Sequence, residues 1–263
     1  MRNIKLTIEY DGTNYRGWQI QPGYDTIQGR LESALSRIIK SEAGVLGAGR
    51  TDAGVHALGQ VANFRTESKM TPDEFRLAFN SLLPRDIVIN YVEEVDKNFH
   101  SRFDAINRTY HYTILNANTP SALLRNYVYL SAKPIDIDIM NIACNHLIGT
   151  HDFSSYASLS DPVFSTIRTV NIAEWTLLDS DSSVLGYERG HRLIRFRIEA
   201  NAFLRGMIRA ITGTLLEVGI GKIYPEKVKE IMEAKDRTIA SSSLPAKGLC
   251  LVRVDYPVES KTC

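Results

Sequence analysis

Cysteine is scarce in this sequence, and the cysteines and histidines present form no pattern typical of a metal site or of disulfides. Cys144, Cys250 and Cys263 are far apart in the chain and are not spaced as a CxxC pair. Among the six histidines there is no HExxH spacing, and no acidic residue supports the closest pair, His146 and His151. Because zinc sites and disulfide frameworks need closely spaced ligands or paired cysteines, we expect neither in this protein.

Long apolar runs are also missing. The uninterrupted apolar stretches extend over only a few residues, whereas a helix that crosses a bilayer needs about 20. The first ten residues alternate polar and apolar side chains and carry charges, which predicts a strand rather than a signal peptide. With 44% hydrophobic and 23% charged residues, the chain has the composition of a globular protein, and we expect it in the cytoplasm with no membrane segment.

A strong net charge is absent as well, since the formal net charge is only +1, but the segment from Arg189 to Arg209 is basic. It contains one acid, Glu199, and six arginines: Arg189, Arg192, Arg195, Arg197, Arg205 and Arg209. A local basic stripe on a neutral protein is typical of a surface that faces nucleic acid, although an ordinary solvated face has the same composition.

The order of the expected elements predicts an α+β fold, with a mixed and mostly antiparallel sheet from two similar halves flanked by helices. We place the halves at 1–105 and 106–263 and expect them to pack as one rigid catalytic unit. Capping boxes are predicted at Asp25 with Gln28, and at Thr71 with Pro72 and Glu74. Further strands are expected near 61–65, 86–95, 108–115, 170–178, 191–199 and 248–256, and further helices near 137–148, 202–218 and 225–234.

The densest cluster of unusual residues is Gly47–Ala57, which reads GAGRTDAGVHA. Its glycines permit close backbone approach, and no Gly-Lys-Ser/Thr follows them, so the cluster is not a nucleotide-binding P-loop. Asp52 is the one carboxylate in this stretch. It is a candidate catalytic group, or alternatively a turn residue that bonds its own backbone.

Blocks in order along nearly the whole chain resemble the motifs of the tRNA pseudouridine synthase A family. Gly47–Ala57 resembles the signature loop of that family. The other matching blocks are YDGT with Tyr15 and GWQ from Tyr10 to Gln19, TIQG at Thr26–Gly29, FHSRF at Phe99–Phe103, RTYHY at Arg108–Tyr112, GTHDF at Gly149–Phe153, NAFL at Asn201–Leu204 with Met207, Arg209 and Gly213, and Gly248-Leu249.

The resemblance implies a pseudouridine synthase fold with a central RNA-binding cleft, and catalysis by Asp52, Tyr110 and Arg209. Asp52 would be the nucleophile or base, Tyr110 would pack on the target base, and Arg209 would pair with Asp52. An adjacent guanidinium favours the ionised carboxylate in a dry pocket, where burial alone would raise its pKa. In a helix over 202–218, Arg209 would share one face with Arg205 and Gly213.

Other residues are weaker candidates for RNA binding. Arg50 is adjacent to Asp52 and is expected to contact phosphate or to hold the flipped base, whereas His56, Arg16 and Arg205 are further candidates. Arg195 and Arg197 share one face of an expected strand and either line an RNA groove or face solvent. For His151-Asp152-Phe153 we expect a helix-end capping role, and Ser241-Ser242-Ser243 together with 161–168 departs from the family pattern.

The resemblance further implies a homodimer that isomerises uridine to pseudouridine at positions 38, 39 and 40 of the tRNA anticodon stem-loop. This reaction transfers no electrons and adds no group, so we expect it to need neither cofactor nor metal. Three alternatives stay open: a pseudouridine synthase acting on another RNA site, a binding-only RNA chaperone, and a phosphate-binding nucleotide enzyme.

Overall fold

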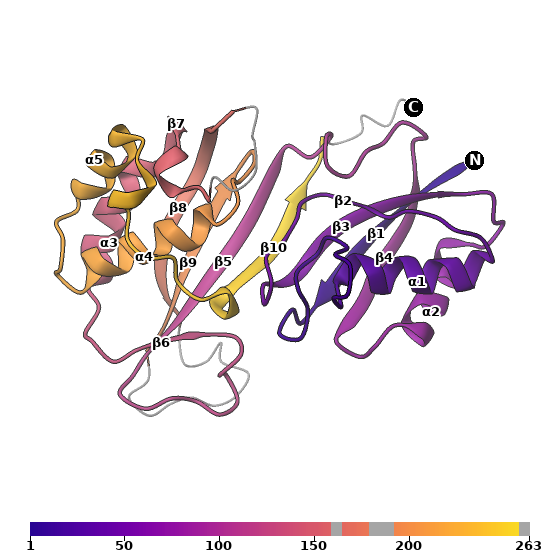
Figure 1. Ribbon diagram of the computed structural model, residues 1–263, viewed down its shortest axis with the longest axis horizontal. Coiled ribbons are helices and arrows are strands. Elements are labelled where there is room, and N and C mark those ends of the chain that lie inside the picture. The colour runs from indigo at the N-terminus through magenta and orange to yellow at the C-terminus, as the bar shows by residue number, and fades with distance from the viewer. Residues whose placement is uncertain (159–164, 179–191, 258–263) are drawn as a thin grey trace. The chain divides into compact units, whose positions relative to one another are not determined.

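The computed structural model describes residues 1–158, 165–178 and 192–257, and the chain forms two compact units (Figure 1). Unit 1 comprises Met1–Arg108 and Cys250–Cys263, and unit 2 comprises Thr109–Leu249. The first boundary lies close to the join expected at 105/106. The second differs from the expectation that 106–263 forms one half, because the last strand pairs with a strand of unit 1.

Unit 1 is built on strands in the order β4-β1-β3-β10. The central strand β1 (Arg2–Tyr10) is antiparallel to both β3 (His56–Thr66) and β4 (Ile87–Val95). The last strand, β10 (Leu249–Asp255), runs parallel to β3, and the short β2 (Leu46–Gly47) pairs antiparallel with β3. The alternating pattern of the N-terminal segment therefore produces the strand that it predicted, with Ile4, Leu6 and Ile8 fully buried.

Two helices, α1 (Ile27–Ile39) and α2 (Pro72–Leu82), lie beside this sheet (Figure 1). Phe64 of β3 packs against α2 through edge contacts, with ring centroids 5.4 Å from Phe75 and 6.0 Å from Phe79. Aromatic pairs prefer such edge-to-face geometry. The apolar residues of α1 that join the core are those at helical spacing in the sequence: Ile27, Leu31 and Leu35.

One of the two predicted capping boxes is confirmed and the other is wrong. The Thr71 side chain accepts the Glu74 N–H, while the Glu74 carboxylate accepts the Thr71 N–H at 2.7 Å. The first helix is instead capped by Thr26, which accepts the N–H of Gly29 at 3.3 Å. Asp25 pairs with Arg30 on the surface, because the chain is still extended at Thr26 and places Asp25 one residue too early to cap.

Unit 2 has strands in the order β5-β9-β8-β7. Strand β8 (Ile167–Leu178) is antiparallel to both β9 (Arg192–Ala200) and β7 (Gly149–Asp152). Strand β5 (Asn107–Asn116), which begins at the unit boundary, also pairs in parallel with the short β6 (Tyr129–Ser131). The short strands β2, β6 and β7 were not predicted, because segments of two to four residues show no measurable alternation.

The helices of unit 2 are α3 (Ile137–Cys144), α4 (Met207–Gly219) and α5 (Lys227–Ala234), which lie near β8 and β9 (Figure 1). Helix α4 begins at Met207 rather than near Ala202, because Gly206 adopts a left-handed conformation (φ 72°) that cannot belong to a right-handed helix. Single turns of 3₁₀ helix complete the unit: η1 (Asn145–Leu147), η2 (Ser154–Tyr156), η4 (Arg237–Ile239) and η5 (Ala246–Gly248).

The predicted fold class is confirmed: the protein is α+β, its sheet is mixed and mostly antiparallel, and helices flank it. The halves are similar, since each has a path of four strands and one additional short strand. Within the described residues, no helix is both long enough and apolar enough to span a bilayer.

Candidate active site

Asp52 opens a tight turn in the loop between β2 and β3. The Val55 N–H donates to the Asp52 carbonyl oxygen at 3.2 Å, and Gly54 inside this turn has φ 77°. A positive φ at the third position of a four-residue turn strongly favours glycine. The Asp52 side chain is partly exposed. The turn considered as the alternative role of Asp52 is therefore present, and the Asp52 carbonyl closes it.

The N-terminal motif holds the loop through its backbone. The Trp18 N–H donates to the Thr51 carbonyl at 3.0 Å, and the Gly54 N–H donates to the Tyr15 carbonyl at 3.3 Å, so both neighbours of the Asp52-Ala53 pair are fixed. Tyr10 adds a buried hydroxyl contact of 2.8 Å with the Thr51 side chain. The two sequence blocks are thus one structural element, in which the first clamps the second.

Glycines allow the N-terminal motif to pack closely against the Asp52 loop. A β-carbon on Gly12 would lie 2.0 Å from the Val55 carbonyl oxygen, and one on Gly47 would lie 2.5 Å from the Trp18 ring. Neither distance is compatible with a side chain. Gly49, in the same loop, has no atom within 4 Å of its β position, so its neighbours impose no such requirement.

His56 lies beneath the loop and is only 6% exposed. Its Nδ1 accepts the Gly12 N–H at 3.1 Å, and the Asp11 Oδ1 lies 3.1 Å from the same nitrogen. The structure therefore gives His56 a supporting position against the N-terminal motif rather than a place on the surface.

Arg50 and Arg16 both lie on the exposed side of this loop region. The Arg50 Nε donates to Gln19 Oε1 at 3.0 Å, and Gln19 Nε2 donates to Gln28 Oε1 at 2.8 Å. The guanidinium of Arg16 lies 5.0 Å from the centre of the Tyr24 ring. The link from Arg50 to Gln28 was missed at the sequence level, where Gln28 was interpreted as a capping residue.

In unit 2, Tyr110 and Arg209 come from β5 and the first turn of α4. Tyr110 is 8% exposed, and its ring makes an edge contact with Phe203 at 5.3 Å between centroids. The Arg209 Nε donates to the Leu244 carbonyl at 2.7 Å. Arg205 lies in the turn before α4 and is exposed, so it does not share a helical face with Arg209 as predicted; the left-handed conformation of Gly206 keeps Arg205 out of the helix.

Arg195 and Arg197 lie on the opposite face of the unit 2 sheet from Tyr110. Glu199, on their face of β9, accepts the Thr109 hydroxyl at 3.0 Å. Burial, and then the charges of Arg195 and Arg197, lower the pKa of His111 to about 4. Because side chains alternate along a strand, Tyr110, between Thr109 and His111, faces the other way.

Arg197 is partly exposed and lies beside an acid of the neighbouring strand β8. Arg197 NH1 lies 3.3 Å from Glu174, and both side chains are substantially exposed, whereas Ile194, Phe196 and Ile198 are fully buried on the other side of β9. The alternation predicted for β9 is confirmed. Arg189, which belongs to the same basic stretch of sequence, lies outside the described residues.

The candidate residues are therefore distributed between the units. Asp52, Arg50, His56 and Arg16 belong to unit 1, and the rest belong to unit 2: Tyr110, Arg195, Arg197, Arg205 and Arg209. In the part of the chain that the structure describes, no group of three or more His, Cys, Asp or Glu side chains has an arrangement that would hold a metal ion.

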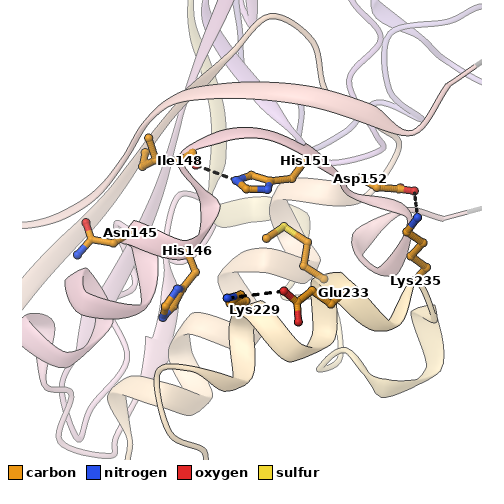
Figure 2. A pocket seen from close by; sticks show the side chains of 9 residues that line it. Asn145, His146, Ile148, His151, Asp152, Lys229, Glu233 and Lys235 are labelled. Carbon is orange, nitrogen blue, oxygen red and sulfur yellow. Dashed lines mark hydrogen bonds and ion pairs between the residues drawn. The ribbon is translucent and has the colours of Figure 1, made fainter.

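A pocket of about 360 Å³ lies elsewhere in unit 2, between the α3–β7 region and α5 (Figure 2). None of the candidate site residues lines it. Lys235 lies 3.5 Å from Asp152, and Lys229 lies 3.7 Å from Glu233, so the charges at its rim are offset in pairs. His151 contacts the Ile148 carbonyl at 2.8 Å through Nε2.

Two residues of the GTHDF block, His151 and Asp152, line this pocket. Most of the block forms strand β7, so the helix-end capping role expected for His151-Asp152-Phe153 holds only for Asp152. Asp152 does accept the N–H of Ser154, the first residue of η2, at 3.0 Å. Hydrogen bonds, first from Thr166, lower the pKa of Asp152.

The comparisons with known proteins agree on one family. A sequence model described as tRNA pseudouridine synthase matches residues 6–104 and 143–257. The chain is 44% identical to "tRNA pseudouridine synthase A 2" of Clostridium perfringens. It is 46% identical to proteins named "tRNA pseudouridine synthase A" from Clostridium acetobutylicum and Caldicellulosiruptor bescii. Each of these alignments covers 97% of this chain and 100% of the relative.

A solved structure, titled "Crystal Structure of a Cbf5-Nop10-Gar1 Complex", has a chain that aligns with 95% of this protein and is covered to 58%. The sequence identity is 14% and the TM-score is 0.32, a similarity too small to support an argument.

Proposed function

Because the chain belongs to the tRNA pseudouridine synthase family, we propose that it isomerises uridine to pseudouridine at positions 38, 39 and 40 of the tRNA anticodon stem-loop. The observation that carries this proposal is the Asp52 loop. The family's signature residues form a turn whose two flanks are fixed by backbone hydrogen bonds to the N-terminal motif. A carboxylate on a rigid loop is the preorganised group that such a reaction requires.

The chemistry breaks the N1–C1′ bond of uridine, rotates the uracil and joins C5 to C1′, while the C5 proton is released and N1 gains a proton. Atoms balance without an oxidant, a reductant or an added group. Asp52 supplies the carboxylate, either by covalent addition to the sugar or base or by removal of the 2′ proton to give a glycal. Both routes require the carboxylate to be ionised.

Tyr110 and Arg209 have the second and third roles in this proposal. A uridine inside a stem must leave its stack before it reacts, which costs a few kcal/mol. Stacking on an aromatic ring recovers about 1–3 kcal/mol per base, and Tyr110 is the ring proposed for it. Arg209 supplies the cation that keeps Asp52 ionised. The roles draw on both units of the chain.

Recognition of tRNA is proposed to rest on basic side chains. Arg50, Arg16 and Arg205 are exposed and are the proposed phosphate contacts near the reacting nucleotide. Arg195 and Arg197 are proposed to contact RNA at a different surface, because they lie across the sheet from Tyr110. For His56, its burial favours an indirect part through the loop. We further propose that the protein forms a homodimer in the cytoplasm. Native mass spectrometry of the purified protein tests the dimer.

Tritium release from tRNA labelled at uridine C5 tests the proposal. Transcripts would carry uridine only at position 38, 39 or 40, and EDTA would be present throughout. We expect release from each substrate with the wild type, and loss of at least about 1,000-fold in the Asp52→Asn variant, in line with removal of a catalytic proton-transfer or nucleophilic group.

The matched control is Asp73→Asn, which removes a carboxylate that is 85% exposed on the outer side of α2. It is expected to retain wild-type release. Tight tRNA binding without release from any of the three substrates would instead favour another RNA site or a binding-only RNA chaperone. Release by Asp52→Asn at the wild-type rate would contradict the role of Asp52.

A further inference from the structure

The segment Ser241–Pro245 follows one face of helix α4. Ser241 Oγ donates to Glu217 Oε2 at 2.6 Å, and the Leu244 N–H donates to the Arg209 carbonyl at 3.1 Å. Between these contacts, a β-carbon on Gly213 would lie only 2.2 Å from the Ser242 carbonyl oxygen. Residues 209, 213 and 217 are spaced by four, so all three contacts lie on the same side of the helix.

The same segment is also attached to strand β5. The Tyr112 hydroxyl donates to the Pro245 carbonyl at 2.8 Å, and a β-carbon on Gly248 would lie 2.7 Å from the Tyr112 ring. Tyr112 is fully buried, and burial raises the pKa of its phenol, so the hydroxyl stays a donor. Because side chains alternate along a strand, Tyr112 shares its face of β5 with Tyr110.

Two consecutive carbonyl groups therefore receive hydrogen bonds from the two elements that carry proposed catalytic residues. The Leu244 carbonyl accepts Arg209 Nε at 2.7 Å, and the Pro245 carbonyl accepts Tyr112. A residue that precedes proline is restricted to extended conformations, which limits the directions that the Leu244 carbonyl can take. The sequence Leu244-Pro245 thus predisposes the acceptor that Arg209 uses.

We propose that Ser241–Pro245 is a positioning strap for Arg209. The inference rests on the proposed function, in which Arg209 keeps Asp52 ionised. A guanidinium is planar, so a hydrogen bond at Nε fixes the direction of its other two nitrogens. The acceptor is a neutral carbonyl, which orients the group without cancelling its charge as a carboxylate would. Leu244 is a positioning residue in this account, and it acts through its backbone.

The departure from the family pattern at Ser241-Ser242-Ser243 does not remove the contact with Arg209. The bonds to Arg209 use the backbone N–H and carbonyl of Leu244, and the close approach at Gly213 uses the carbonyl of Ser242. Ser241 adds one side-chain hydrogen bond to α4, at Glu217. A different side-chain sequence can therefore place the same backbone atoms on this helix.

The test is a double-mutant cycle on the single-turnover rate of tritium release, with tRNA affinity measured separately by titration. Gly213→Ala displaces the strap, and we expect it to slow the reaction by at least tenfold while the Kd for tRNA changes less than twofold. In an Arg209→Ala background, Gly213→Ala is expected to have no further effect on the rate, because the residue through which the strap acts is already gone.

Thr212→Val is the matched control on the same helix. It removes a buried hydroxyl that donates to the Ile208 carbonyl of the same helix at 2.7 Å. We expect it to lower the melting temperature and leave the rate unchanged. If Gly213→Ala does not fold, Tyr112→Phe takes its place in the cycle, since it removes only the hydrogen bond to Pro245; the expected loss is then about threefold and again absent without Arg209.

The outcomes separate the two proposals. Wild-type rate in Arg209→Ala would refute the role of Arg209 in the proposed function. A slow Arg209→Ala with normal rates in both Gly213→Ala and Tyr112→Phe would overturn the strap alone. The strap would also be overturned if Gly213→Ala or Tyr112→Phe slowed the reaction by the same factor in the Arg209→Ala background as in the wild type. The segment would then act independently of Arg209.

Discussion

Gly17 lies directly against Thr51: its φ is 91°, and a β-carbon on Gly17 would be 2.5 Å from the Thr51 carbonyl oxygen. Two independent constraints therefore require glycine at this position, one from the backbone conformation and one from space. Both arise because the N-terminal motif closes over the loop that carries Asp52.

Gly17→Ala is expected to destabilise the protein and to slow catalysis. The left-handed conformation alone costs a residue with a β-carbon about 1–2 kcal/mol, and relief of the clash would move Thr51 and hence Asp52. Thermal unfolding and tritium release measure the two effects. Gly49→Ala, in the same loop but with open space around its β position, is the control and should change the melting temperature little. Equal effects of Gly17→Ala and Gly49→Ala on melting temperature and tritium release would argue against close packing of the N-terminal motif on the Asp52 loop.

The link between Gln19 and Arg50 is expected to matter for tRNA binding. Arg50→Gln removes the cation, and Gln19→Ala removes the 3.0 Å hydrogen bond that limits where the cation points. Because this bond is exposed, we expect only a modest weakening of tRNA binding from Gln19→Ala, about threefold. In an Arg50→Gln background, Gln19→Ala should add nothing. Filter binding measures the affinities, and full additivity would show that Gln19 acts by another route.

Arg195 and Arg197 should affect affinity and its salt dependence, but not the chemical step. Each lost phosphate contact reduces the slope of log K against log salt by about 1. The double variant Arg195→Gln/Arg197→Gln is therefore expected to reduce the slope of log K against log salt. Its single-turnover rate at saturating tRNA should be unchanged. Arg76→Gln is the control, since Arg76 is also partnered by an acid but lies on α2, which carries none of the proposed RNA contacts. An unchanged salt slope would assign the two arginines to an ordinary solvated face.

His111 predicts how stability changes with pH. Burial and the two nearby arginines lower its pKa to about 4 in the folded protein, whereas the unfolded value is 6.5. Between these values the unfolded state binds more protons, so the free energy of unfolding falls as the pH drops from about 6.5 to about 4. One proton contributes at most about 1.4 kcal/mol per pH unit, and solvent screening of this partly exposed ring reduces it.

Urea unfolding at several pH values checks this prediction. His111→Gln cannot titrate, so its stability should fall less steeply than that of the wild type over that window. The two proteins should show parallel profiles above about pH 7, where His111 is neutral in both states. Identical slopes below pH 6.5 would mean that His111 is not held neutral by its surroundings.

Several elements were predictable because their signals are local. The alternation of β1 and β9 and the Thr71 capping box are contained in a few neighbouring residues, and the structure matches them. The start of α1 was misplaced by one residue because Asp25 and Thr26 are both good caps, and only the entry of the chain from Trp18 decides between them. The Gln28 N–H donates to the Trp18 carbonyl oxygen at 3.0 Å.

The resemblance supplied candidate residues for the site, but it did not supply their contacts. Resemblance identified Asp52, Tyr110 and Arg209. It gave no sign that Thr51 is held by Tyr10 and Trp18, or that Leu244 meets Arg209, because these pairs are brought together by the fold across long stretches of sequence. The glycines of the motifs were the available signal, since several of them have positions that exclude any β-carbon.

Strand β10 makes unit 1 dependent on the order in which the polypeptide is synthesised. Cys250 and Leu251 pair with His56 and Ala57, the residues that directly follow the Asp52 loop. A ribosome that has translated unit 1 up to Arg108 has not yet produced this neighbour of β3. The strand beside the loop therefore stays incomplete during elongation, and a chain that stops before Cys250 lacks the support at the base of that loop. A nascent chain would acquire the finished Asp52 loop only after β10 has been translated.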